Sequence, residues 1–272
     1  MTALDWAGQT THSLREHIDE RSVALLPLGA IEQHGAHLPL ATDTWIADGL
    51  AEAALQRCDE ALQVLRLPTL ALGQGLEHMD WPGTLALSAT TLEALLYDIG
   101  ASLARAGLRR VVMFSAHGGN LATLATAALR LRRDFDLLVV QACYFDFPPP
   151  ADALTAREAR EGLHGGALET ALMWHFAPQH VDARALAYHA SVEFEALAGF
   201  EWIGAETRPA RFAWLASDLN RVGVCGDARA ADAALGARLA AHYADGLARV
   251  LAEAADFPLT CLAPAGPPPN QR

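Results

Sequence analysis

The amino-acid sequence predicts an α/β fold in which helices lie on both faces of a mostly parallel sheet. Short apolar runs with the length of buried strands alternate with segments that carry apolar residues at helical spacing. Such alternation is typical of β-α-β units, which place consecutive strands parallel in one sheet. The chain has 272 residues, of which 52% are hydrophobic, so a large core can be buried.

Four short apolar runs are predicted to form the strands of this sheet. They are bounded by polar or turn residues, as expected of buried strands, and cover residues 23–31, 63–72, 110–115 and 137–145. The second run contains Pro68, which has no backbone N–H and therefore favours an edge strand or a bend.

Five longer segments carry apolar residues three or four positions apart, which is the spacing of an amphipathic helix. They cover residues 44–58, 88–106, 120–133, 166–176 and 229–255. Ser88 is a suitable N-cap for the second of these helices. Residues 183–217 are irregular and match no single element.

Length and composition predict one domain and limit its partners. The domain is expected to span residues 1–262, and the Pro-rich residues 263–272 are expected to form a loosely packed tail. A formal net charge of −12 gives a surface that repels phosphate backbones. Nucleic acid is therefore not an expected partner.

The features that the sequence lacks indicate a cytoplasmic protein. No run of about 18 apolar residues is present, so no membrane span is expected. The N-terminal residues lack the basic and apolar regions of a signal peptide. The four cysteines form no CxxC pair and are expected to be reduced thiols; they are Cys58, Cys143, Cys225 and Cys261.

Three polar clusters lie near predicted strand ends, where open α/β sheets bind ligands. The first contains Glu32, His34 and Asp43, directly after the first strand. If strand geometry continues to His34, the side chains of Glu32 and His34 share one face. These residue types suit Zn²⁺, Mn²⁺ or Fe²⁺, with His37 expected beside the ligands rather than among them. The alternative is a capped turn in which Asp43 is the helix N-cap.

The second cluster runs from Ser115 to Asn120, directly after the third strand. His117 precedes two glycines and a helix, so its imidazole is expected over the end of the sheet. The backbone N–H groups of Gly118, Gly119 and Asn120 could hold a developing oxyanion of the substrate. A tight strand–helix turn with an incidental histidine is the alternative.

The third cluster contains His164 and Glu169, around the glycines that open the fourth helix. Glu169 lies beside the apolar face of this helix, where a buried carboxylate needs a partner or a cation. His164 precedes the helix and is the candidate proton donor to a leaving nitrogen. Alternatively, Glu169 only interacts favourably with the helix dipole.

Together the three clusters could hold two divalent metal ions about 3.5–4 Å apart, with Asp43 as the bridge. Such a pair activates a water that attacks an amide carbon, so no side-chain nucleophile is required. The chain also lacks a G-x-S-x-G elbow, which makes a serine hydrolase a weak alternative. His78 and Trp81 are expected to line the pocket, although a turn at Pro82 and Gly83 would explain them equally well.

These motifs resemble those of the creatininase (creatinine amidohydrolase) family. The matching stretches span most of the chain and are LPLGAIEQHGAHLPLATD, EHMDWPGTLALS, FSAHGGN, HGGALET and GVCGDARAA. The resemblance implies a three-layer α/β/α fold, a dinuclear metal site and a homo-oligomer, often a hexamer. By position, the residues that match the family's metal ligands are Glu32, His34, Asp43 and His117.

The chain departs from true creatininases at one position. The resemblance implies a His-Tyr-Glu-Asn pattern in those proteins, with its Glu as a metal ligand. This chain has Gly119 at the position of that Glu. His164 and Glu169 match the family's catalytic-site His and Glu, and Glu169 is expected to take the missing ligand role, as in a wider His-Gly-Gly-Asn branch. That branch resembles formamide deformylases of flavin and deazaflavin biosynthesis and peptide-trimming enzymes of redox-cofactor maturation.

The sequence therefore predicts a metal-dependent amidohydrolase that cleaves a non-peptide or cyclic amide C–N bond. A small molecule such as a creatinine-like lactam or a formamide is the expected substrate. Two alternatives stay open: a peptidase that trims a dedicated cofactor-precursor peptide, and an inactive binding protein of the same fold.

Overall fold

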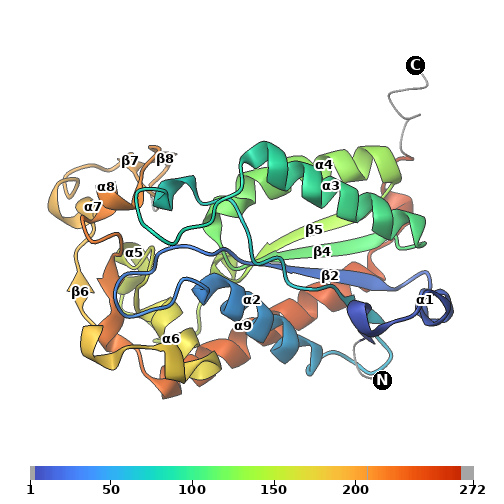
Figure 1. Ribbon diagram of the computed structural model, residues 1–272, viewed down its shortest axis with the longest axis horizontal. Coiled ribbons are helices and arrows are strands. Elements are labelled where there is room, and N and C mark those ends of the chain that lie inside the picture. The colour runs from blue at the N-terminus through green and yellow to red at the C-terminus, as the bar shows by residue number, and fades with distance from the viewer. Residues whose placement is uncertain (1–3, 207, 265–272) are drawn as a thin grey trace.

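The computed structural model describes residues 4–206 and 208–264, and a parallel five-stranded sheet lies at its centre (Figure 1). The strands are β1 (Leu4–Asp5), β2 (Val23–Leu28), β3 (Val64–Arg66), β4 (Arg110–Ser115) and β5 (Leu138–Cys143). They pair in the order β1-β3-β2-β4-β5, and every pair is parallel. The predicted mostly parallel α/β fold is confirmed.

Helices cover both faces of this sheet and form the outer two layers. One face carries α3 (Ala89–Arg105) and α4 (Leu121–Phe135), which lie above the sheet in Figure 1. The opposite face carries α2 (Thr42–Leu55), α6 (Ala167–Phe176) and α9 (Ala233–Asp256).

The core is divided by the sheet into two apolar clusters. Along β2, Val23 and Leu25 pack with α2, α6 and α9, whereas Ala24 and Leu26 pack with α3 and α4. All residues of β2 are buried, as expected of a parallel strand covered on both faces. This burial explains why the strand reads as a continuous apolar run.

Most predicted boundaries agree with the structure, and the exceptions have local causes. The predicted strand at residues 63–72 is shortened to β3, because Pro68 cannot donate to the ladder and the chain bends there. Ser88 caps α3 as predicted, through a bond from the Thr91 backbone N–H of 3.2 Å. The last helix begins at Ala233 rather than at 229, because Asp232 accepts from the Leu235 N–H and acts as its N-cap.

Several short elements were not predicted. The stretch that matched no single element forms a border of small strands and helices, seen at the left of Figure 1. The unpredicted strands and α-helices are β1 (Leu4–Asp5), α1 (Thr11–His17), α5 (Glu158–Glu161), β6 (Tyr188–His189), α7 (Val192–Glu195), β7 (Ile203–Gly204), β8 (Ala210–Arg211), α8 (Ala216–Leu219) and β9 (Gly226–Asp227). The predicted Pro-rich tail at 263–272 lies mostly outside the described residues. Within the described part of the chain, none of the helices has the length and apolar character needed to cross a membrane.

Candidate metal centre

Glu32 and His34 lie in the loop after β2 and not in an extension of that strand. The predicted strand at residues 23–31 ends earlier, at Leu28, so the condition that strand geometry continues to His34 is not met. The loop is fixed by the Glu32 backbone N–H, which donates to Leu40 O at 2.9 Å, and by a turn at Gly35 with a φ of 69°. Glu32 and His34 are nevertheless both 1% exposed.

Asp43 lies in the first turn of α2, and its carboxylate joins two histidines. The N-cap of α2 is Ala41, so the alternative that Asp43 caps this helix is wrong. Asp43 Oδ1 lies 3.2 Å from His34 Nε2, and Asp43 Oδ2 lies 3.1 Å from His117 Nδ1. The loops after β2 and β4 therefore meet at one carboxylate, as the rule for strand ends predicts.

Backbone carbonyls determine which ring nitrogen carries the proton in three histidines. A carbonyl oxygen only accepts, so the ring nitrogen that contacts it carries the hydrogen. The contacts are 3.1 Å for His34 Nδ1, 2.5 Å for His117 Nε2 and 2.7 Å for His164 Nε2. In the neutral rings, the other nitrogen of each histidine carries a lone pair, and this nitrogen faces a carboxylate.

The carboxylate oxygens beside these histidines fit a divalent metal. Both Oε atoms of Glu32 and Oδ2 of Asp43 are buried, and none accepts a hydrogen bond from the described residues. His117 nitrogens lie 3.2 Å from Glu32 Oε2 and 3.1 Å from Asp43 Oδ2, but without the alignment of a hydrogen bond. Two atoms bound to a tetrahedral zinc at about 2.1 Å lie about 3.4 Å apart, so a shared cation suits these separations. A buried charge without such a partner is costly.

Three groups of side chains among the described residues have the spacing needed to hold an ion. The first contains Glu32, Asp43 and His117, and the second contains His34, Asp43 and Glu169. A third contains Glu32, His34 and His164. Asp43 belongs to the first two groups, which is the position that a bridging carboxylate requires.

The pKa values of the cluster indicate that it needs positive charge. Burial raises the pKa of Glu32 to about 7. Burial alone would lower the pKa of His34, but the carboxylates of Asp43, Glu169 and Glu32 together outweigh it and raise that pKa to about 10. His117 has its pKa raised well above 6.5 in the same way, by Glu32 and Asp43 against burial. Protons on these rings supply the charge that a metal ion would otherwise bring, and a metal-bound ring would be neutral.

Glu169 lies in the first turn of α6, with its carboxylate directed at the same cluster. Its Oε2 accepts from the Gly165 backbone N–H at 2.6 Å and lies 3.9 Å from His34 Nε2. Its side chain is 14% exposed, and burial raises its pKa. These contacts place it among candidate ligands, beyond what a favourable interaction with the helix dipole requires.

His164 and His78 stack beside Glu32. The ring centroid of His164 lies 4.3 Å from those of both His34 and His78, and burial lowers the pKa of His164 well below 6.5. His78 is 2% exposed, and its Nε2 lies 3.2 Å from Glu32 Oε1. Its Nδ1 accepts from the Gln33 side-chain amide at 3.1 Å, so Nε2 carries the proton of the neutral ring. His78 therefore faces Glu32 with an N–H group and not with a lone pair.

The other predicted substrate-binding residues lie close to the cluster, and their role stays a prediction. Trp81 is half-buried, and its indole Nε1 is buried without an acceptor in the described part of the chain. Gly118 and Gly119 form a 3₁₀ turn with Asn120. The Asn120 side chain is buried and donates to Gly29 O at 3.0 Å, which joins this turn to the loop after β2.

The contact of Glu77 with His117 was not predicted from the sequence, whereas a position of His37 beside the ligands was. Glu77 Oε1 lies 3.7 Å from His117 Nε2, and a Cβ at Gly119 would lie 2.5 Å from the same oxygen. Glu77 immediately precedes His78 in a motif that the sequence does contain, but only the fold brings it to His117. His37 contacts Gly165 O and Thr170, so it lies beside the ligands as predicted.

Comparison with known proteins identifies relatives over most of the chain. The family model described as Creatininase: Creatinine amidohydrolase matches residues 7–251. A mycofactocin precursor peptide peptidase of Mycolicibacterium smegmatis is 30% identical over 244 residues, which is 89% of each chain. A creatinine amidohydrolase of Pseudomonas putida is 32% identical over 189 residues, which is 63% of this chain and 71% of the relative.

Solved structures have the same fold. A creatinine amidohydrolase (creatininase) structure has a TM-score of 0.74 at 25% identity and covers 95% of this chain and 99% of its own. A structure described as Creatininase Mn has a TM-score of 0.77 at 24% identity and covers 94% of this chain and all of its own.

Proposed function

The chain belongs to the creatininase family of hydrolases, and from this premise we propose that it hydrolyses an amide C–N bond with two divalent metal ions. The observation that carries the proposal is the set of three buried carboxylate oxygens, two of Glu32 and one of Asp43, that accept no hydrogen bond from the described residues. The Asp43 oxygen lies 3.1 Å from the lone pair of His117 Nδ1. The ions would polarise the amide carbonyl and lower the pKa of a water molecule. The residues that would hold them are Glu32, His34, Asp43, His117 and Glu169.

His164 has one ring nitrogen free to exchange a proton with the substrate. Its Nε2–H is donated to Gln33 O at 2.7 Å, so a proton for the leaving nitrogen would pass through Nδ1. Nδ1 lies 3.8 Å from Glu32 Oε1, at the edge of the cluster. The Gln33 bond holds the ring in one orientation while Nδ1 acts.

A peptide amide is the substrate class that we favour. The similarity to the precursor peptide peptidase extends over 89% of both chains, whereas the similarity to the creatinine amidohydrolase covers 63% of this chain. Gly119 supports the same choice, because the family resemblance implies a Glu ligand at this position in true creatininases. A cyclic or formyl amide of a small molecule, the substrate class expected from the sequence, is the second candidate.

Metal analysis combined with a substrate panel tests this proposal. The purified chain is expected to carry about two equivalents of divalent metal. Short peptides, creatinine and an N-formyl aminopyrimidine are then compared as substrates before and after chelation. Hydrolysis of peptides that stops on chelation and returns with Mn²⁺ or Zn²⁺ supports the proposal. Full activity after exhaustive metal removal would overturn it.

Three further features of the protein stay predictions. We propose a cytoplasmic location, a homo-oligomer such as a hexamer, and a single domain over residues 1–262. Size-exclusion chromatography with light scattering measures the oligomeric state directly.

A further inference from the structure

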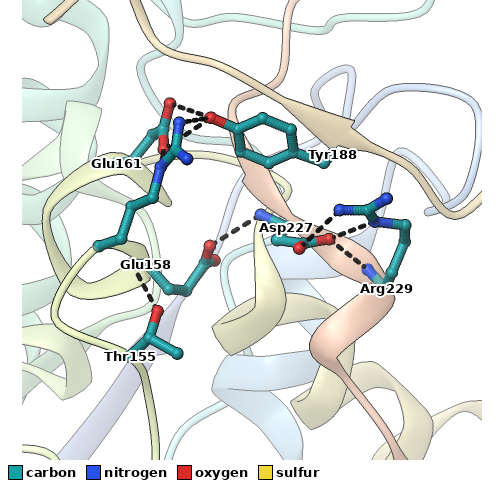
Figure 2. Close-up of a pocket in the computed structure, with 7 residues that line it drawn as sticks. Thr155, Glu158, Glu161, Tyr188, Asp227 and Arg229 are labelled. Atoms are coloured by element: carbon teal, nitrogen blue, oxygen red, sulfur yellow. Dashed lines mark hydrogen bonds and ion pairs between the residues drawn. The ribbon is translucent and has the colours of Figure 1, made fainter. Parts of the chain in front are cut away.

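A small pocket outside the metal cluster contains two carboxylates that are almost fully buried (Figure 2). Glu158 is 6% exposed and Glu161 is fully buried, and both come from α5. The pocket lies between α5, the β6–β9 pair and the turn after β9. Buried carboxylates need partners, so the groups that bond to them show what they hold together.

The two oxygens of Glu158 accept hydrogen bonds from two separate segments of backbone. Oε1 accepts a hydrogen bond of 2.6 Å from the N–H of Ala167, the first residue of α6. Oε2 accepts from the Asp227 N–H at 2.7 Å, in β9, as drawn in Figure 2. One side chain therefore joins the start of α6 to β9.

Three glycines from three segments leave room for the Glu158 carboxylate. A Cβ atom at Gly162, Gly166 or Gly226 would lie 2.2, 2.5 or 2.8 Å from Glu158 Oε1. Such distances are far below ordinary contact, so these positions exclude larger residues. Gly166 belongs to the HGGALET motif and Gly226 to the GVCGDARAA motif, so the space for Glu158 explains a glycine in each motif.

Both segments held by Glu158 lead directly to the candidate metal centre. Glu169 follows Ala167 in the first turn of α6, and its Oε2 accepts from the Gly165 N–H. On the other side, the Cys225 N–H donates to His164 O at 2.8 Å, one residue before Gly226. His164 and Glu169 thus lie on backbone that Glu158 ties together.

We propose that Glu158 is a positioning residue that holds His164 and Glu169 in place by bonding to the start of α6 and to β9. This inference rests on the proposed function, because the positioned groups are those assigned to the metal centre. Glu158 does not touch the cluster, so it acts only through Ala167 and Asp227.

Glu161 provides a matched control in the same pocket. Its carboxylate accepts from Tyr188 Oη at 2.9 Å, from the Ser191 N–H at 2.7 Å and from Arg157 Nε at 2.7 Å. None of these partners belongs to α6 or β9. Glu161→Gln therefore changes a buried carboxylate of the same helix and leaves both hydrogen bonds of Glu158 in place, although Tyr188 lies in β6, which pairs with β9.

Hydrogen–deuterium exchange of the full chain without metal tests the link directly. In Glu158→Gln the amide NH₂ must face either the Ala167 or the Asp227 N–H, so one of the two bonds is lost. Exchange of the peptides that cover residues 164–170 is expected to become about tenfold faster in Glu158→Gln and to stay unchanged in Glu161→Gln. Equal exchange of these peptides in the wild type and Glu158→Gln would overturn the inference. This measurement stands even if the wild type binds no metal.

Mn²⁺ titration gives the second measurement. Glu158→Gln is expected to bind the weaker Mn²⁺ equivalent about tenfold less tightly, with KM little changed and kcat reduced. A wild type that binds no Mn²⁺ would contradict the proposed function, whereas unchanged Mn²⁺ binding in Glu158→Gln would contradict the positioning role. If Glu158→Gln does not fold, Gly166→Ala displaces the same carboxylate from the other side and is expected to show the same weakening. Wild-type Mn²⁺ affinity in folded Gly166→Ala would also overturn the inference.

Discussion

His117 Nδ1 lies 3.1 Å from Oδ2 of Asp43, although one residue follows strand β4 and the other lies in the first turn of helix α2. The proton of the neutral His117 ring is held on Nε2 by the Gln74 carbonyl, so two lone pairs face each other in a buried site. A proton or a cation must lie between them, because a buried, unpaired carboxylate is too costly. The metal chemistry of this chain depends on that contact.

Asp43→Asn is expected to remove both metal ions. The Asp43 carboxylate belongs to two of the candidate ligand groups. In Asn the amide is neutral, and its nitrogen, which cannot bind a metal ion, replaces one of the two carboxylate oxygens. Metal content measured by elemental analysis should fall from about two equivalents to well below one, and kcat by more than about 100-fold. Asp134→Asn is the control, since Asp134 is paired with Arg133 and Tyr97 away from the cluster. Full metal content in Asp43→Asn would contradict the bridging role.

Metal affinity is expected to rise with pH above about 6.5. The pKa of His34 is raised to about 10, so its ring is protonated on both nitrogens near pH 7 in the metal-free protein, and the raised pKa of His117 favours the same state there. A metal ion binds only the neutral ring, so binding expels these protons and becomes easier as pH rises. The affinity for Mn²⁺ should increase at least about tenfold from pH 6.5 to 7.5, for one or more protons released. Calorimetry in buffers of different ionisation enthalpy measures the release, and a flat profile would contradict the assignment of these ligands.

The same histidines make the metal-free protein less stable at high pH. A pKa of about 10 for His34 in the folded chain lies above its ordinary value of 6.5. Its stabilising contribution is therefore complete below about pH 6.5 and is lost as the pH rises towards 10. Thermal unfolding of chelated protein should give a Tm that falls between pH 7 and 9.5, and His34→Gln should flatten this slope. A Tm that rises over this range would contradict the buried charge pair.

The sequence predicted the site better than the segments that support it. Because β4 is buried on both faces, its continuous apolar run predicted both of its ends correctly. The polar residues after β2 and β4 led to Glu32 and His117, because ligands bind at strand ends in such sheets. The residues that contact His117 from outside the cluster could not be predicted, because Glu77 and Gln74 reach it only after a loop folds over the sheet. The short elements at residues 183–217 likewise depend on tertiary contacts, since none is long enough to show a period.

Gly119→Ala is expected to disrupt the metal centre, whereas Gly118→Ala is expected to be tolerated. A Cβ at Gly119 would lie 2.4 Å from His117 Nε2 and 2.5 Å from Glu77 Oε1, so the imidazole must move. At Gly118 the nearest atom would be Phe145 Cζ at 3.6 Å, an ordinary contact. Activity and metal affinity should fall at least about tenfold in Gly119→Ala, because the displaced ring is one of the candidate ligands. Equal metal affinity in the two variants would mean that His117 adapts freely and is not held by its surroundings.

Gly236→Ala is expected to destabilise the fold, against the usual effect of this substitution in a helix. Replacing glycine by alanine inside an exposed helix stabilises it by about 1 kcal/mol. At Gly236, however, a Cβ would lie 2.0 Å from the Ala171 carbonyl oxygen, where α9 packs against α6. Backbone cannot rotate away as a side chain can, so urea unfolding should show a loss of about 2 kcal/mol or more.

The control for this contact is Gly199→Ala, because a Cβ there would meet no atom within 4 Å. Its free energy of unfolding should stay within about 0.5 kcal/mol of the wild type. Since α6 carries Glu169, Gly236→Ala should also weaken metal binding, as α6 is displaced from the cluster. A Gly236→Ala protein as stable as the wild type would mean that α6 and α9 separate without cost. The position of Glu169 would then depend on the hydrogen bonds at the start of α6 and not on the packing of the two helices.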